Sequence, residues 1–531
     1  MHVLMVAAEN GALAGGKVGG LGDVIRDAPN ALASKGHQVS VITPGYGILA
    51  NPENSHKIAD IDVLFCDRRE TVSLFSVKAK NTQPHIQHWV LEHWLFAAGG
   101  VGAIYSNDHY GPFATDAHKF ALFCAGVGQV LNARILQDID VLHCHDWHSA
   151  SLLILRQFSK NYLFLQSLHT VFSIHNLAIQ GVRPIQGDDS SLLSWFPEIN
   201  GDFEFITHPR DETLVNLMRA GINLADRVHT VSPTYAKEIL LPSDPKRGFV
   251  GGEGLESDLS KVNQDRRLFG ILNGCDYDLP QTPPLSRAKI FETIDQVLDQ
   301  WAQSKSPNFK NYYFALRKLE QWKKIRKELN PVVASIARVT PQKFGLLKLN
   351  GEPSFVGKEN DSTTFVLDEL LLMIDPGVLI IFGNGDSDYE AFFTDAMARH
   401  KNFMYLCGYS DALAKALYQY CDLYFMPSMF EPCGISQMLA MREGTPCLVH
   451  AVGGLKDTVI PSLNGFTFEG LTTDEIVKQM LQQMEAAVNC FQNDSDKWHA
   501  FCQQASAARF LWGDSAEAYC QLLYNSNLPY A

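Results

Sequence analysis

The sequence lacks the features that mark several classes of protein. Its eleven cysteines include no C-x-x-C pair, which disfavours zinc ribbons and redox dithiol motifs. No run of 18 apolar residues occurs, and the first nine residues have no basic leader, so we expect neither a membrane anchor nor a signal peptide. Several cysteines lie in or beside apolar runs, as reduced buried thiols do. These absences predict a cytoplasmic protein.

Positive charge is also scarce. The chain has 44 Lys and Arg against 58 Asp and Glu, which gives a net charge of −14. Such a field repels nucleic acid and anionic membranes, so we expect neither as a partner. A phosphate-bearing ligand must then be held by a few local cations. With 531 residues, 46% of them hydrophobic, the chain is long enough for two or more domains with substantial cores.

Short apolar runs alternate with helical patterns, which is typical of parallel sheets covered by helices. The strands predicted in the first half are 3–8, 39–43, 87–91, 141–144, 171–175, 228–231 and 268–272. Those of a second series are 332–336, 378–382, 403–407, 423–426 and 447–450. The stretch between the two series, about residues 280–330, is expected to be helical and largely solvent-facing. Its basic run at 318–327 fits a solvated helix face better than a binding patch.

Several polar clusters lie at or beyond the carboxyl ends of predicted strands. They are residues 17–23, 143–148, 175–176 and 428–434. Open parallel sheets bind ligands beyond the carboxyl ends of their strands, where loop amides and helix N-termini point outward. The first and last clusters are more than 400 residues apart. We therefore expect two half-sites that face a cleft between two domains.

The first cluster is a glycine loop that carries one cation, Lys17. The preceding G-x-x-x-x-G-K spacing resembles a P-loop, but Val18 stands where a Ser or Thr must ligate magnesium, and no G-x-G-x-x-G opens the helix. Nucleotide triphosphatase and hydride-transfer functions are therefore disfavoured. Gly19 and Gly20 allow close approach of the backbone to a ligand, and the following helix N-terminus can hold a phosphate. A tight turn with a surface lysine is the structural alternative.

The sequence His-Cys-His-Asp-Trp-His follows another predicted strand and invites a metal interpretation. On a strand end, however, His143 and His145 share one face and Asp146 lies on the other, which disfavours joint zinc ligation. The functional alternative is that Asp146 binds sugar hydroxyls. His175 and Asn176 offer similar hydrogen bonds without a charge, although a lone histidine is more often structural.

Two cations and a carboxylate mark the second half of the chain. Arg338 and Lys343 follow the predicted strand 332–336, where two cations can neutralise a diphosphate leaving group without magnesium. Two merely exposed basic residues are the alternative. Glu431 precedes Pro432, which favours an extended backbone before the next helix. A buried carboxylate beside a helix N-terminus stays ionised and can oppose positive charge that develops on an anomeric carbon.

In this order and at these separations, the motifs resemble those of bacterial glycogen synthases and plant starch synthases, the retaining glucosyltransferases of family five. The matching segments are K-V-G-G-L-G-D-V from Lys17, H-D-W-H from His145, S-I-H-N-L-A-I-Q-G from Ser173, T-V-S-P-T-Y-A from Thr230, G-I-L-N-G-C-D from Gly270, F-E-P-C-G from Phe430 and G-G-L-K-D-T-V from Gly453. The resemblance implies a GT-B fold of two Rossmann-like domains facing a central cleft. It places the acceptor-side domain at 1–265 and the nucleotide-sugar domain at 266–512, with 513–531 crossing back onto the first.

The resemblance also implies a reaction and a set of site residues. The reaction is transfer of glucose from ADP-glucose to the non-reducing end of an α-1,4-glucan, without a metal or other cofactor. Glu431 corresponds to the essential carboxylate, and Arg338 and Lys343 correspond to the diphosphate-binding pair. Asp146 and His175 correspond to residues near the transferred glucose. The positions that the resemblance assigns to substrate binding are Lys17, Gly19, Gly20, Asn176, Asn273, Tyr409, Cys433, Gly434, Gly453 and Gly454.

Some positions depart from the family pattern. Phe344 stands where glycine is general, Met429 where arginine is common and Glu443 where tyrosine is usual; the segments 280–330 and 346–365 also match poorly. The altered loops leave two alternatives open. One keeps the fold and uses UDP-glucose or a small acceptor, and the other is a non-catalytic glycan-binding or regulatory protein on a transferase scaffold. The retained cations and carboxylate favour the enzyme.

Overall fold

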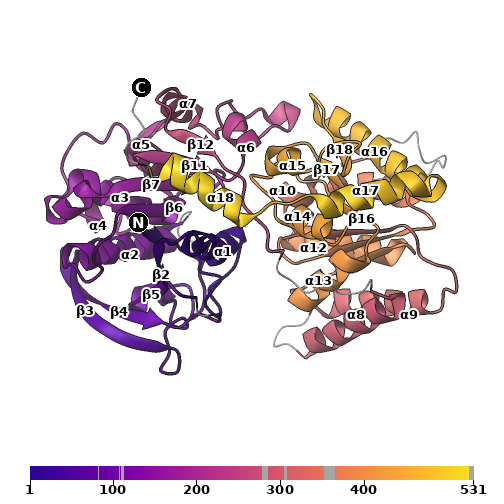
Figure 1. The fold of residues 1–531 in the computed structure, drawn as a ribbon, viewed down its shortest axis with the longest axis horizontal. Helices are drawn as coiled ribbons and strands as arrows, with labels where there is room; N and C mark the ends of the chain where they lie inside the picture. The colour runs from indigo at the N-terminus through magenta and orange to yellow at the C-terminus, as the bar shows by residue number, and fades with distance from the viewer. Residues whose placement is uncertain are drawn as a thin grey trace. The chain divides into compact units, whose positions relative to one another are not determined.

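The structure is a computed structural model of the chain. The residues that it describes are 1–81, 83–106, 108, 113–277, 285–303, 308–351 and 365–525. Three stretches singled out in the sequence, 280–330, 346–365 and 513–531, lie partly outside the described residues. The chain folds into two compact units (Figure 1). Unit 1 comprises residues 1–243, 251–274 and 511–531, and unit 2 comprises residues 244–250 and 275–510.

A mixed sheet forms the centre of unit 1. Its described strands are β1 (His2–Val6), β2 (Gln38–Pro44), β3 (Ser55–Phe65), β4 (Arg68–Val77), β5 (Ile86–Glu92), β6 (Val141–His145), β7 (His169–Ile174), β11 (Arg227–Thr230) and β12 (Leu268–Gly270). Their order is β12-β11-β7-β6-β1-β2-β5-β4-β3. The first seven strands in that order pair in parallel, whereas β4 and β3 pair antiparallel at one edge. The seven parallel strands are the ones predicted from the sequence, and the β3–β4 hairpin was not predicted.

Helices cover both faces of this sheet. They are α1 (Gly20–Ser34), α2 (Ala114–Asn132), α3 (Trp147–Phe158), α4 (Leu192–Trp195), α5 (Leu217–Leu224), α6 (Pro233–Glu238), α7 (Glu256–Gln264) and α18 (Trp512–Ala518), with 3₁₀ segments η1 (Trp94–Ala97) and η2 (Lys160–Ser167) and a π-helical end η5 (Tyr519–Leu523). A small sheet of β8 (Val182–Pro184), β10 (Asp211–Asn216) and β9 (Thr207–His208) adds to the unit.

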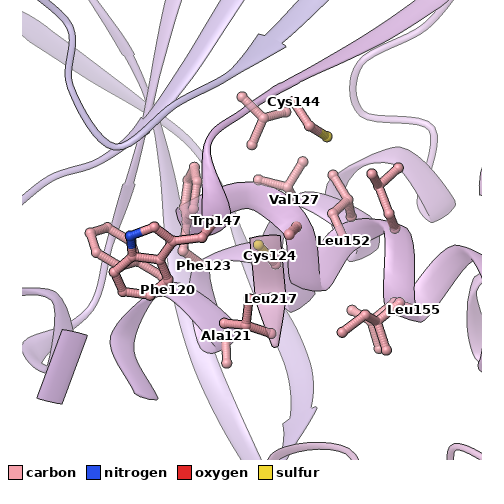
Figure 2. Close-up of a cluster of buried hydrophobic side chains, with 14 of the residues drawn as sticks. Phe120, Ala121, Phe123, Cys124, Val127, Cys144, Trp147, Leu152, Leu155 and Leu217 are labelled. Carbon is pink, nitrogen blue, oxygen red and sulfur yellow. The ribbon is translucent and has the colours of Figure 1, made fainter. Parts of the chain in front are cut away.

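Alternate side chains of β1 enter two different cores. Leu4 and Val6 belong to the core that α2 and α3 cover, which Figure 2 shows in part. Val3 and Met5 belong to the core of the opposite face, where α1 lies beside α18 (Figure 1). Burial on both faces explains why this strand reads as an unbroken apolar run, as central strands of parallel sheets do.

Unit 2 is built on a second parallel sheet. Its described strands are β13 (Val332–Ile336), β14 (Val378–Phe382), β15 (Phe403–Leu406), β16 (Leu423–Met426), β17 (Cys447–His450) and β18 (Gly465–Phe468), in the order β15-β14-β13-β16-β17-β18. Its helical segments are η3 (Pro245–Arg247), α8 (Arg287–Ala302), α9 (Phe309–Lys323), α10 (Pro341–Phe344), η4 (Gly345–Lys348), α11 (Val366–Met373), α12 (Ser387–Arg399), α13 (Asp411–Tyr420), α14 (Ser436–Arg442), α15 (Gly453–Thr458), α16 (Thr473–Asn493) and α17 (Ser495–Ala507). Together the two units confirm the predicted fold class of two Rossmann-like α/β sheets.

The stretch between the two predicted strand series is helical, as expected. Many of its described residues are exposed, including most of the basic run, but one face of each helix is buried. Ile294 of α8 and Trp322 of α9 are fully buried in the core of unit 2. Lys318, in the basic run, is only 7% exposed and its amine donates to the carbonyl of His400. The prediction of a solvated face was therefore wrong for this lysine. Its aliphatic stem follows the apolar side of α9, and a backbone carbonyl satisfies the ammonium.

Among the described residues, no helix combines the length and apolar character needed to cross a membrane.

Candidate functional site

An ion pair lies at the centre of the predicted site in unit 2. Lys343 is on α10 after β13, and Glu431 is on the loop after β16. These strands are parallel neighbours, so their carboxyl ends meet at one edge of the sheet. The Lys343 ammonium forms a salt bridge with Glu431 Oε2, and the hydroxyl of Ser428 donates to the same oxygen over 3.2 Å. The side chains are 16% and 7% exposed respectively, so a nearly buried carboxylate is held with a counter-charge.

Backbone contacts fix the loop that carries Glu431. Met429 N–H donates to the carbonyl of Gln342 over 2.7 Å, and the Gln342 side-chain amide donates to the carbonyl of Phe430 over 3.1 Å. His450 Nδ1 lies 2.9 Å from the carbonyl of Ser428, to which it donates. These contacts fix the backbone of the loop that carries Glu431 against α10, which carries Lys343.

Glycines bring a third loop against the first two. Gly453 has φ of +45°, and a Cβ there would overlap the carbonyl oxygen of Glu431. The N–H of Gly454 donates to that same oxygen over 3.1 Å, and a Cβ at Gly454 would overlap the carbonyl of Cys433. Gly434 also has positive φ, of +73°. These close approaches require the absence of a side chain, which explains the G-G turn and the glycine after the buried Cys433.

Arg338 and Tyr409 lie at the same edge of the unit 2 sheet. Arg338 is two residues beyond β13 and is exposed. Tyr409 follows β15 and is 66% exposed; its hydroxyl donates to Asp411 over 2.5 Å, and its carbonyl accepts from Trp301 Nε1 over 3.3 Å. Since all strands of this sheet are parallel, the predicted residues of unit 2 gather at its carboxyl edge, where ligands of such folds bind.

In unit 1, the glycine loop binds a carboxylate that the sequence-based prediction missed. Glu9 Oε2 accepts from the N–H groups of Val18 and Gly19 over 2.8 and 2.7 Å, and Tyr105 donates its hydroxyl to Glu9 Oε1 over 2.8 Å. Glu9 is buried. Its place directly after the first predicted strand was the available signal. The loop amides at 18 and 19 are therefore satisfied within unit 1.

The cation of this loop is also paired. Lys17 Nζ donates to Asp23 Oδ1 over 2.7 Å, and Arg26 approaches the same oxygen at 3.0 Å. Lys17 is about one-third exposed. A phosphate bound by Lys17 would compete with Asp23 for the lysine ammonium. At Gly20, further along the loop, the space that a Cβ would take is open.

Asp146 and His175 are adjacent at the ends of β6 and β7. The N–H of His175 donates to Asp146 Oδ1 over 2.8 Å. Burial raises the pKa of Asp146 to about 7; the nearby charge of Glu9 adds to the shift, while backbone hydrogen bonds from His175 and Asn176 oppose it. The carboxyl group can therefore donate or accept a hydrogen bond near neutral pH. Burial lowers the pKa of His175 to about 3, which keeps its ring neutral.

The two predicted asparagines differ in their surroundings. Asn176 Oδ1 accepts from the N–H of Ala178 over 3.0 Å, so this oxygen closes a local turn. Asn273 follows β12, is buried, and its Oδ1 has no hydrogen-bond partner within the described part of the chain. Like Asp146 and His175, both lie beyond parallel strands of unit 1. The structure thus brings the predicted residues of each unit to the carboxyl edge of that unit's sheet.

Within the described ranges, no group of three or more His, Cys, Asp or Glu side chains is arranged to hold a metal ion. His143 and His145 stack on each other, with ring centroids 4.2 Å apart, and each has a ring nitrogen in a hydrogen bond with a neighbouring side chain. The donor set at this strand end therefore has the character of a hydrogen-bonded network.

One departure from the family pattern has a structural explanation in the core. Phe344 is fully buried in unit 2 and packs edge-on against Phe393, with ring centroids 5.4 Å apart. Its side chain therefore fills core volume beneath α10 and does not displace the neighbouring Lys343. Met429 is only partly buried and lies against the position that a Cβ at Gly345 would take.

Comparison with known proteins covers nearly the whole chain. Residues 2–261 match the family described as starch synthase catalytic domain, and residues 367–494 match glycosyl transferases group 1. The chain is 32% identical to a glycogen synthase of Streptococcus equi subsp. zooepidemicus (strain H70), across 98% of this chain and 99% of that protein. It is also 32% identical to a glycogen synthase of Desulfitobacterium hafniense, with 95% of each chain covered.

Solved structures agree with these sequence similarities. The catalytic domain of starch synthase IV from Arabidopsis thaliana, bound to ADP and acarbose, superposes with a TM-score of 0.74 and 25% identity over 98% of each chain. A sucrose-phosphate synthase from Thermosynechococcus elongatus gives a TM-score of 0.53 at 15% identity, with 98% of each chain covered. The second similarity concerns the fold alone.

Proposed function

This chain belongs to the glycogen synthase and starch synthase family and is a glycosyltransferase, and we propose that it transfers glucose from ADP-glucose to the non-reducing end of an α-1,4-glucan with retention of configuration. The observation that carries the proposal is the Lys343–Glu431 pair at the carboxyl edge of the unit 2 sheet. It combines a cation for a departing diphosphate with a carboxylate for the sugar. A sugar nucleotide donor and a glucan acceptor are the partners that membership of the family implies.

Unit 2 is proposed to bind the donor. Lys343 and Arg338 would neutralise the diphosphate as it departs, in place of a metal ion. As Lys343 turns its charge toward phosphate, Glu431 keeps the hydrogen bond from Ser428 and opposes the positive charge on the anomeric carbon. The exposed ring of Tyr409 offers a face on which a nucleobase can stack.

Unit 1 is proposed to bind the transferred glucose. Asp146, whose pKa is raised to about 7 by burial, and the neutral ring of His175 can both hydrogen-bond sugar hydroxyls without bringing a fixed charge. Lys17, released from Asp23, would assist at the donor phosphates.

The chemical step needs no separate base. The bond between the anomeric carbon and the diphosphate oxygen breaks, and the acceptor hydroxyl forms a new bond to that carbon on the same face. The hydroxyl proton passes to the departing phosphate oxygen, so atoms and charge balance without a redox partner. The protein's contribution is then positioning and electrostatic stabilisation.

Two further statements belong to the proposal. We expect the reaction to be metal-independent, since Arg338 and Lys343 can neutralise a departing diphosphate. The enzyme works in the cytoplasm, a compartment that suits eleven cysteines of which none forms a disulfide.

The test is an assay of the purified chain with radiolabelled ADP-glucose and UDP-glucose, each offered with glycogen and with short malto-oligosaccharides. We expect label from ADP-glucose in glycogen. Incorporation only from UDP-glucose, or only into short acceptors, would replace the stated substrates by the alternative pair. A chain that transfers no glucose in any combination would refute the catalytic proposal in favour of glycan binding alone.

A further inference from the structure

Four histidines at adjacent strands form a cluster in unit 1, in which His143, His145 and His229 are buried and His175 is partly exposed. His143 and His145 lie on β6, His229 lies on β11, and His175 directly follows β7. In a neutral imidazole one ring nitrogen donates and the other accepts, so the partners of each ring determine where its proton lies. Burial lowers the pKa of all four rings. The cluster is therefore neutral at physiological pH, and its tautomers follow from its contacts.

Four hydrogen bonds form a chain with one direction. His229 Nε2 lies 3.4 Å from the carbonyl of Ile271, so it carries the proton. Its Nδ1 must then accept from the Ser173 hydroxyl, at 2.7 Å. Ser173 Oγ in turn accepts from His143 Nε2 at 2.6 Å. His143 Nδ1 is left to accept from the hydroxyl of Tyr524 at 2.9 Å. This chain holds the His143 ring in place.

His145 stacks on that fixed ring and contacts His175. The planes of His143 and His145 are 24° apart, and His145 Nδ1 lies 3.0 Å from His175 Nε2. The other ring nitrogen of His145, Nε2, is buried and has no hydrogen-bond partner among the described residues. A proton on this Nε2 would be an orphan buried N–H, which folded proteins avoid. His145 therefore carries its proton on Nδ1 and donates it to His175 Nε2.

From this geometry we propose that His145 is a positioning residue that holds His175 in the tautomer with its proton on Nδ1. His175 Nε2, which faces the interior, accepts from His145, and the opposite ring nitrogen of this partly exposed side chain becomes a donor. It is then suited to an oxygen acceptor of the transferred sugar and unsuited to a donor. This inference rests on the proposed function for the identity of the ligand, whereas the tautomer itself stands on the contacts alone.

Histidine tautomers can be measured directly. The full chain, labelled with ¹⁵N only in histidine, would be examined by long-range ¹H–¹⁵N correlation, with the His175 signal assigned by its loss in His175→Asn. We expect a protonated Nδ1 and an unprotonated Nε2 at His175. In His145→Ala that preference should be lost, whereas His145→Asn places an amide donor near the former Nδ1 and should restore it. A proton on Nε2 of His175 in the wild-type chain would overturn the inference without recourse to any variant.

Kinetics supply an independent measurement. His145→Ala should lower kcat on the order of tenfold to a hundredfold, as small misplacements of a binding group do, with little change in KM for glucan. His145→Asn should recover most of the loss. The matched control is His118→Ala, which removes another histidine of unit 1 that accepts a side-chain hydrogen bond, from Trp195 over 3.2 Å; its kcat should stay near that of the wild type.

The two claims fail separately. Equal kcat losses in His145→Ala and His145→Asn would contradict positioning through the Nδ1 donor. A wild-type chain that transfers no glucose would refute the proposed function, and its His175 spectrum would still decide the tautomer.

Discussion

Removing Lys343 should destabilise unit 2 because it leaves the Glu431 carboxylate buried without its counter-charge. Glu431 is 7% exposed, and among the described residues the side-chain donor that remains to it is the Ser428 hydroxyl at 3.2 Å. Breaking a buried pair by deleting one partner typically costs about 3–5 kcal/mol. Lys343→Ala should therefore lower the free energy of opening of unit 2 by about that amount. Adding Glu431→Gln should recover most of it, because the uncompensated charge is then removed.

Hydrogen exchange followed by mass spectrometry reads the two units separately. Peptides from β16 should exchange faster in Lys343→Ala, while peptides from β6 in unit 1 should be unchanged. The control is Lys456→Ala, which removes an exposed salt bridge to Glu469 at 3.2 Å and should cost less than about 1 kcal/mol. If Lys343→Ala costs no more than this control, or if Glu431→Gln adds to the loss, the view of a buried, mutually dependent pair is refuted.

Three other properties should follow from the structure. Gly453→Ala should reduce transferase activity and the thermal midpoint, since Gly453 has φ of +45° and a Cβ there would overlap the Glu431 carbonyl. The control is Gly513→Ala, where a Cβ has open space, and its thermal midpoint should stay near that of the wild type. Equal thermal midpoints for the two variants would contradict the steric argument. Unit 1 should lose stability between pH 7.5 and 5, because the unfolded chain protonates its histidines below about pH 6.5 while His175 and His229, with pKa values lowered by burial to about 3 and about 4, stay neutral. At pH 5 each of these two histidines lowers the free energy of unfolding by roughly 2 kcal/mol. Asp146, whose pKa burial raises to about 7, offsets roughly the loss from one histidine. Amides of unit 1 that are better protected from exchange at pH 5 than at pH 7.5 would contradict this prediction. Activity should persist in EDTA, and a large loss that magnesium or manganese restores would contradict the metal-independent reaction.

Most strands of the parallel sheets could be predicted because burial on both faces leaves an unbroken apolar run. The edge strand β18, which pairs with β17, was not predicted. The β3–β4 hairpin was missed because one of its faces is open, so β3 mixes exposed and buried positions and its run is broken by polar residues. Lys318 was misjudged for a related reason. Its contact with the His400 carbonyl depends on how α9 packs, which charge patterning along one helix does not specify.

The site residues that lie just beyond parallel strands could be predicted from the sequence. Asp146, His175 and Glu431 each come after a parallel strand, so a correct strand assignment places them at a sheet edge. Glu9 was missed although it also follows a strand, because its partners Val18 and Gly19 are reached only after the loop folds back. The ring contacts of His145 likewise join two strands, and no spacing in the sequence reports which nitrogen of a ring is left without a partner.

The most direct test of the central claim measures glucose transfer from ADP-glucose to glycogen by the wild type and by Glu431→Ala, with ADP binding measured by calorimetry alongside. The exposed carboxylate Glu469 provides the control Glu469→Ala. The wild type and the control should transfer glucose, and Glu431→Ala should lose on the order of 10³-fold in kcat while binding ADP with similar affinity. Near-normal turnover by Glu431→Ala, or no transfer by the wild type, would contradict the account.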